Sequence, residues 1–262
     1  MRRSILRALP SPGGGASAIL GFLMLLAIWW AATALLQLRP VILPSPVTVG
    51  QKFLEMAASG TLTTDILVSL RELLWGFLIG CAAGLLSGIV LADSGWLSGF
   101  LEPIVETFRF VIPFSLVPLV VVWFGVSVIG KIFVVAYACY FVMAINTASA
   151  IKGIDPLVLK AARMLGVSGW QLRVRVILPA ALPRILTGLQ LALAYAWVSV
   201  IAAEYVGASA GLGYLITNAE AGLETARVMA GMVVIGFLGF VFSAIVGALR
   251  QLLVPYAEDA GW

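Results

Sequence analysis

The chain has 262 residues, of which 62% are hydrophobic and only 11% are charged, with a formal net charge of +4 and no histidine. A water-facing surface needs a larger share of charged residues, so this composition excludes an ordinary soluble domain and indicates an integral membrane protein. Because histidine is absent and Cys81 and Cys139 both fall in apolar stretches, we expect no metal site, no disulfide and no cofactor.

Charged residues divide the chain into six uncharged apolar runs. A helix of about 20 residues crosses a hydrocarbon core of about 30 Å, and each run is long enough to do so. We therefore predict an all-α polytopic membrane protein with six transmembrane helices, in which residues 1–262 form a single transmembrane domain. The runs cover residues 8–38, 73–92, 110–130, 132–151, 185–203 and 228–249.

The distribution of Lys and Arg predicts the orientation. Ten basic residues fall in the N-terminal segment, in residues 152–184 or at Arg250, against five at the opposite side of the predicted spans. By the positive-inside rule, both termini and the 152–184 loop are cytoplasmic in a multi-pass protein of the cell (inner or plasma) membrane. The N-terminal segment resembles a secretory signal, but residues 17–38 form a longer apolar run without a small-x-small cleavage site, so we interpret it as an uncleaved first helix.

The second predicted span carries glycine at every fourth position. A proline-rich connection at 40–46 and a short surface helix at 47–58 precede this span, which begins near Asp65. Four glycines on one helix face allow the backbone of another helix to approach closely. We favour packing within the chain, with a subunit contact or a pore wall as the alternatives. The four residues are Gly76, Gly80, Gly84 and Gly88.

Polar residues accompany the third predicted span. Glu102, Glu106 and Arg109 are spaced to share one helix face, and Arg109 lies near the start of an apolar run. Ionisable groups at such depth must be paired or face water. Either Glu106 and Arg109 form a pair that stabilises the helix end, or they line a translocation path in which the arginine attracts an anion. Pro113 and Pro118 are expected to kink or break this helix.

Residues 125–131, GVSVIGK, resemble the start of a nucleotide-binding P-loop. Ile132 replaces the Ser or Thr that would hold magnesium, and no strand precedes the motif. We therefore predict no nucleotide site here and no ATP hydrolysis by this chain alone.

The polar segment 152–184 separates two apolar runs and has its own helix signals. Asp155 is a suitable N-cap, Pro156 suits the first helical position and Gly166 suits the helix end. Ser168 is expected to cap a second short helix that extends to about Val176, before Pro179 and Pro183 introduce the fifth span. Basic residues dominate the loop, so it fits either a partner with an acidic rim or an anionic lipid surface.

This loop resembles the cytoplasmic loop of ABC-importer permeases, whose pattern is Glu-Ala-Ala, a glycine four residues later, and an Ile-x-Leu-Pro-like stretch. Lys160 stands here in place of the usual Glu, and the other positions match at Ala161, Ala162, Gly166, Ile177, Leu178 and Pro179. Further segments resemble the nitrate/sulfonate/taurine-type subfamily. They are LPSP (43–46), IPFSLVPLVVVWFG (112–125), AINT (144–147), LPAALPRILTGLQLALAYAW (178–197) and AAEYVGASAGLGYLI (202–216).

The resemblance implies a type I importer permease that forms the path for a small solute, and Arg109 together with the net charge of +4 favours an anion. Its implied partners are ABC ATPase subunits, a periplasmic or surface solute-binding protein, a second permease subunit in a homodimer, and the lipid bilayer, with no nucleic acid. The loop residues implied in coupling to the ATPase are Asp155, Pro156, Lys160, Ala161, Ala162, Arg163, Leu165, Gly166, Ser168, Ile177 and Pro179. An ion-gradient-driven carrier or a channel is the alternative function.

Glu204 and the glycine-rich segment 207–213 follow the fifth span at its outer end. One interpretation is a capped hairpin. The other is an external element that meets the binding protein or gates the path, with Glu106, Arg109 and Glu204 as path residues.

Overall fold

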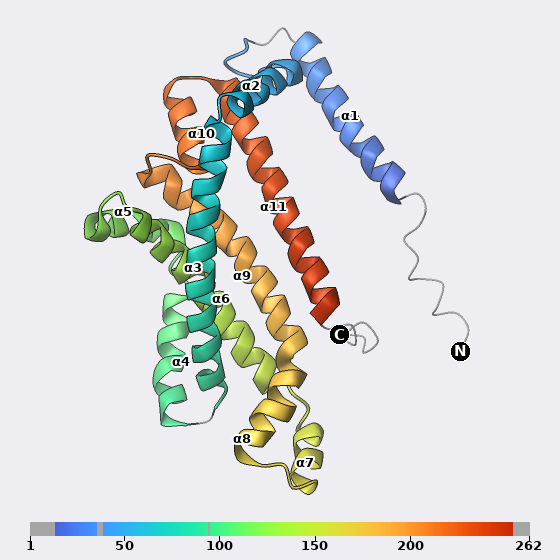
Figure 1. Cartoon of the computed structure of the whole chain (residues 1–262), viewed down its shortest axis with the longest axis vertical. Coiled ribbons are helices and arrows are strands. Elements are labelled where there is room, and N and C mark those ends of the chain that lie inside the picture. The colour runs from blue at the N-terminus through green and yellow to red at the C-terminus, as the bar shows by residue number, and fades with distance from the viewer. Residues whose placement is uncertain (1–13, 36–38, 94, 254–262) are drawn as a thin grey trace.

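A computed structural model describes residues 14–35, 39–93 and 95–253, and every regular element in these ranges is a helix. Four long helices run along the long axis of the molecule in Figure 1: α3 (Thr61–Ala92), α6 (Val128–Lys152), α9 (Leu178–Gly207) and α11 (Thr225–Leu253). All four are long and apolar enough to cross a membrane. The predicted all-α, polytopic architecture is confirmed.

The two ends of the bundle carry different short helices (Figure 1). At one end, called here the loop end, lie α7 (Pro156–Met164) and α8 (Gly169–Leu172). At the opposite end, called the far end, lie α2 (Pro46–Ala58) and α10 (Leu212–Ala221). A π-helical segment, η2 (Arg173–Ile177), joins α8 to α9 without interruption, so residues Gly169–Gly207 form one continuous helix.

The predicted count of six spans is not confirmed. Besides the four long helices there is a bent pair, α4 (Trp96–Phe108) and α5 (Pro113–Phe124), whose axes differ by 97°. The helix α1 (Gly14–Leu35) has 22 residues, and its part Leu20–Leu35 is apolar. Within the described residues, composition and length therefore support four spans, or five if the bent pair counts as one.

The predicted third span, 110–130, is wrong because the chain breaks at both of its ends. Pro113 occupies the first turn of α5, and a proline disfavours helical backbone in the residue before it. Ile112 is accordingly extended, with φ −65° and ψ 128°, and α4 has already ended at Phe108. Gly125, with φ +67°, then ends α5 before α6 begins. Pro118, in contrast, lies inside α5 without breaking it.

The four glycines of α3 face α6. A Cβ added to Gly84 would lie 2.6 Å from the Tyr140 carbonyl oxygen, and one on Gly88 would lie 2.6 Å from the Ala144 carbonyl oxygen. Gly76 and Gly80 meet Val135 and Cys139 in the same way. The two helices thus pack backbone to backbone, and their shared core extends to α9 and α11.

The first helix lies beside α2 and apart from the long helices over much of its length in Figure 1. Trp29 anchors it, because its Nε1 donates a hydrogen bond of 3.1 Å to the Pro44 carbonyl oxygen. The predicted surface helix is present as α2, with the Ser45 hydroxyl accepting from Thr48 N–H at its start. The N- and C-terminal ends and part of the first predicted span lie outside the described residues.

Candidate functional site

The loop helix α7 forms where its sequence signals place it. The Asp155 Oδ1 atom accepts a 2.8 Å hydrogen bond from Leu157 N–H, and Pro156 occupies the first helical turn. At the other end, Gly166 adopts φ +81°, a backbone conformation that favours glycine. Local capping therefore accounts for both ends of this helix.

The second predicted loop helix differs from the expectation. Ser168 stands at the N-cap position of α8, but its side chain makes no capping hydrogen bond. The helix does not stop near Val176, because η2 carries it into α9 and Pro179 falls in the first turn of α9, where a proline is tolerated. The loop thus contains one separate helix, α7, which is followed by α8 and η2 as the N-terminal part of the long helix that includes α9.

Large apolar side chains project from the loop end. Met164 is 90% exposed, Leu165 83%, Trp170 75% and Leu157 70%. We call these four residues the apolar tip. Lys160, Ala161 and Arg163 are also exposed, whereas Ala162 is buried against the chain itself. Exposed apolar groups beside basic ones are typical of a surface that binds another protein.

Two exposed ion pairs join the loop segment to the α3–α4 hairpin. Arg173 Nη2 lies 3.0 Å from Asp93 Oδ2, and Lys152 Nζ lies 3.1 Å from Glu102 Oε1. Both pairs are about half exposed, so each contributes little to stability. The Lys152–Glu102 pair lies between the end of α6 and α4, and the Arg173–Asp93 pair lies between η2 and the end of α3.

A cavity of about 460 Å³ lies beside the break between α4 and α5. Arg109 lines it and forms an ion pair of 3.0 Å with Glu106, one helical turn away on α4. The guanidinium carbon of Arg109 lies 4.7 Å from the centre of the Phe110 ring. The remaining lining is mostly aromatic and aliphatic, with one amide, and includes Tyr137, Phe141, Asn146, Leu191 and Tyr195.

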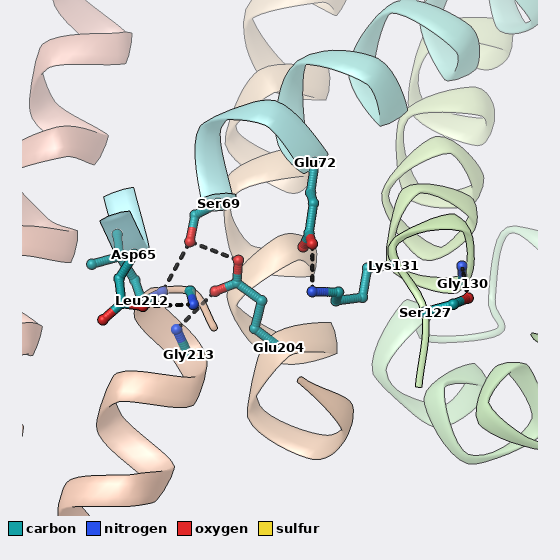
Figure 2. Close-up of polar contacts among 10 residues, drawn as sticks. Asp65, Ser69, Glu72, Ser127, Gly130, Lys131, Glu204, Leu212 and Gly213 are labelled. Carbon is teal, nitrogen blue, oxygen red and sulfur yellow. Dashed lines mark hydrogen bonds and ion pairs between the residues drawn. The ribbon is translucent and has the colours of Figure 1, made fainter. Parts of the chain in front are cut away.

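Glu204 does not line this cavity. It lies near the end of α9, and Figure 2 shows it beside Ser69 of α3 and the first residues of α10. Glu204 Oε1 accepts a 2.6 Å hydrogen bond from the Ser69 hydroxyl, and Oε2 accepts a 2.8 Å bond from Gly213 N–H. Its side chain is 1% exposed. The geometry is that of a capped, glycine-rich connection between α9 and α10.

A buried ion pair lies next to this network, and the sequence interpretation did not identify it. Lys131, in the first turn of α6, pairs with Glu72 of α3 (Figure 2). Glu72 is 1% exposed, and apart from the pair neither of its carboxylate oxygens has a hydrogen-bond partner within the described residues. Both residues stand in largely apolar sequence and carry opposite charges. That combination is the signal from which the pair could have been predicted.

Fold and site together define a polytopic helical membrane protein with an exposed docking loop at one end and a cavity beside a broken helix pair. Residues 80–258 match the sequence profile of the binding-protein-dependent transport system inner membrane component family, and the chain belongs to this family. It is therefore a multi-pass inner-membrane permease subunit of an ABC importer, of the sulfonate/taurine subfamily.

Curated relatives and solved structures agree with this assignment. The chain is 34% identical to the putative aliphatic sulfonates transport permease protein SsuC of Bacillus subtilis over 90% of its length and 86% of that protein. It is also 34% identical to the taurine transport system permease protein TauC of Escherichia coli, over 89% and 86%. In fold it resembles a chain of the inward-facing MetNI methionine ABC transporter, with TM-score 0.65, 17% identity, and coverage of 75% of this chain and 97% of that one.

Proposed function

We propose that the chain imports a small organic anion and that its apolar tip binds a separate ATPase subunit. The observation that supports docking is the exposure of Met164 and Leu165, at 90% and 83%. Side chains of this kind at the end of a water-facing loop are stabilised when a partner covers them. The loop end would then face the cytoplasm, together with both chain termini.

The loop residues divide into those that shape α7 and those that reach the partner. Asp155, Pro156 and Gly166 set its two ends, as the hydrogen bond to Asp155 and the positive φ of Gly166 indicate. Lys160 and Arg163 are exposed and offer positive charge to an acidic surface of the ATPase. Lys160 replaces the glutamate usual in similar permeases, so the matching ATPase surface is expected to carry an acid there. We assign the other loop residues, Ala161, Ala162, Leu165, Ser168, Ile177 and Pro179, to the same coupling unit.

The cavity beside Arg109 supports a path for an anion with an apolar body. A guanidinium recognises a sulfonate or carboxylate through paired N–H donors, and the aromatic lining suits a carbon skeleton. Two of the named relatives are described as a putative permease for aliphatic sulfonates and a permease for taurine, and these solutes share a sulfonate group. A solute-binding protein would deliver the anion at the far end, and a second copy of the chain would complete the path around the cavity.

Affinity purification of the tagged chain from native membranes in mild detergent tests the docking. We expect an ATP-binding-cassette subunit to accompany the wild-type chain and to be lost from the Met164→Ser/Leu165→Ser variant. Leu54→Ser is the matched control, because Leu54 is 66% exposed on α2 at the far end. Recovery of the ATPase with the loop variant at the wild-type level would refute the docking surface.

Uptake by proteoliposomes that contain the complete transporter tests the path, with taurine and hexanesulfonate as probes. Arg109→Ala should reduce uptake by about tenfold or more, because a charge-assisted hydrogen bond contributes about 1.5–3 kcal/mol. Arg109→Lys keeps the charge but loses the paired N–H donors, so its uptake should lie between that of the wild type and that of Arg109→Ala. Unchanged uptake of a transported anion by Arg109→Ala would exclude Arg109 as a solute contact.

A further inference from the structure

Side chains from two other helices hold the first turn of α10. The first N–H groups of a helix have no acceptor within that helix, and Gly211 at the N-cap position has no side chain to offer. The acceptors are Asp65 Oδ1 for Gly211 N–H (2.9 Å), Ser69 Oγ for Leu212 N–H (2.9 Å) and Glu204 Oε2 for Gly213 N–H (2.8 Å). Three successive amide groups are thus bound by α3 and α9 (Figure 2).

This connection has little freedom to move by itself. Asp65, Ser69 and Glu204 are 6%, 0% and 1% exposed, so water does not compete for their hydrogen bonds. Gly211 has φ +120°, and a Cβ on it would lie 2.5 Å from Glu204 Oε1. A Cβ on Gly213 would lie 2.5 Å from the Ile201 carbonyl oxygen of α9. The start of α10 is therefore packed tightly against α9 as well as hydrogen-bonded to it.

The same face of α3 is linked to α6. Asp65, Ser69 and Glu72 are spaced by four and three residues, so they line one side of the helix. Glu72 pairs with Lys131 in the first turn of α6, and the glycine face of α3 packs on α6 further along. From there α6 runs without interruption to Lys152, shortly before α7. The start of α10 is thus joined, through α3, to α6, which extends to the loop end.

We propose that Ser69 and Glu204 are positioning residues for transport, which make the first turn of α10 move together with α3 and α6. The inference rests on the proposed docking of an ATPase on α7. Closure of the ATPase then displaces α6 as a rigid helix, and the hydrogen bonds carry that displacement to the far end, where the solute arrives. Without them, the start of α10 would no longer be tied to α3 and α6 and would not follow the displacement of these two helices.

A fluorophore in that connection tests the inference. The complete transporter is labelled with bimane at Ser209→Cys, an exposed position between α9 and α10, after Cys81 and Cys139 are replaced by alanine. Fluorescence is compared between the nucleotide-free and the ATP–vanadate-trapped states. Ser69→Ala removes two hydrogen bonds from a buried site, and Glu204→Gln keeps the size of the side chain while removing its charge.

We expect a nucleotide-dependent change in fluorescence in the labelled parent and loss of most of that change in both variants, because Ser69→Ala removes two of the hydrogen bonds and Glu204→Gln removes the charge and one acceptor oxygen. Ser87→Ala is the matched control on α3, because the Ser87 hydroxyl donates within its own helix to the Gly84 carbonyl oxygen (3.1 Å) and should behave as the parent. ATPase copurification should be normal in all four proteins, which separates this role from a loss of assembly.

Full changes in both Ser69→Ala and Glu204→Gln would overturn the positioning role. A labelled parent without any change, although it binds the ATPase, would overturn it as well, because the start of α10 would then not move. A parent that does not bind the ATPase would instead refute the proposed docking, so the two failures are distinguishable.

Discussion

Two glycine-to-alanine substitutions should shift stability in opposite directions although their chemistry is identical. At Gly84 the new Cβ would lie 2.6 Å from the Tyr140 carbonyl oxygen and 2.8 Å from the Met143 Cβ. Because one of these atoms belongs to the backbone, α6 has to move away from α3. At Gly236, in the middle of α11, nothing lies within 4 Å of the added atom.

The expected magnitudes follow from these surroundings. Forcing a methyl group into a closely packed contact costs about 1–3 kcal/mol, whereas alanine in place of an open helical glycine stabilises by about 0.5–1 kcal/mol. With about 2–4 °C of melting temperature per kcal/mol in a protein of this size, Gly84→Ala should lower the apparent Tm by about 2–12 °C. By the same conversion Gly236→Ala should raise it by about 1–4 °C.

Thermal unfolding of the detergent-purified chains, followed by tryptophan fluorescence and size-exclusion chromatography, measures the difference. Equal insertion into the membrane is checked first, so that only folded material is compared. A Gly84→Ala protein as stable as Gly236→Ala would refute the close contact between α3 and α6.

Three further substitutions test the buried pair and the loop. Lys131→Met leaves Glu72 buried without its partner and should lower the free energy of unfolding by about 3–5 kcal/mol. The double variant Glu72→Met/Lys131→Met should return to within about 1 kcal/mol of wild type in thermal unfolding. A double variant no more stable than Lys131→Met would contradict this. Asp155→Ala removes the N-cap of α7 and should destabilise that helix by about 1 kcal/mol, visible as faster amide exchange in residues 157–159 and disproved by unchanged exchange. Gly166→Ala meets no atom within 4 Å but forces alanine to φ +81°, at about 1–2 kcal/mol; ATPase copurification should weaken, whereas Gly50→Ala, also in open space, should leave it intact.

The sequence predicted the long helices and the loop helix because their causes are local. Freedom from charge over about one membrane thickness identified α6, α9 and α11, and capping residues identified both ends of α7. The search for uncharged runs does not identify the bent pair α4–α5. Glu102, Glu106 and Arg109 interrupt the apolar pattern of α4, so a search for uncharged runs does not include this helix, although each of the three residues is paired in the fold.

Long-range pairing explains the other differences. Lys131 is one of the five basic residues on the side opposite the 152–184 loop, and its partner Glu72 belongs to a different helix far away in sequence. Glu204 is a candidate path residue from its place in the sequence, but nothing in its sequence neighbourhood indicates that Ser69 donates to it. Isolated charges in apolar sequence indicate that a partner is needed, but which residues meet depends on the packing of the whole bundle.

The break between α4 and α5 has a consequence for solvation. At residues 109–112 the backbone leaves the helical hydrogen-bond pattern; the Phe108 carbonyl oxygen there accepts a 2.7 Å bond from the Tyr137 hydroxyl, and the cavity lies alongside. Hydrocarbon chains offer no hydrogen bonds, so irregular backbone within a membrane protein requires water or protein against it. Lipid tails are therefore a poor solvent for this side of the bundle. In a single copy placed in a bilayer, water would therefore solvate the side of the bundle that carries the α4–α5 break. The other membrane-facing surfaces are apolar and suit lipid.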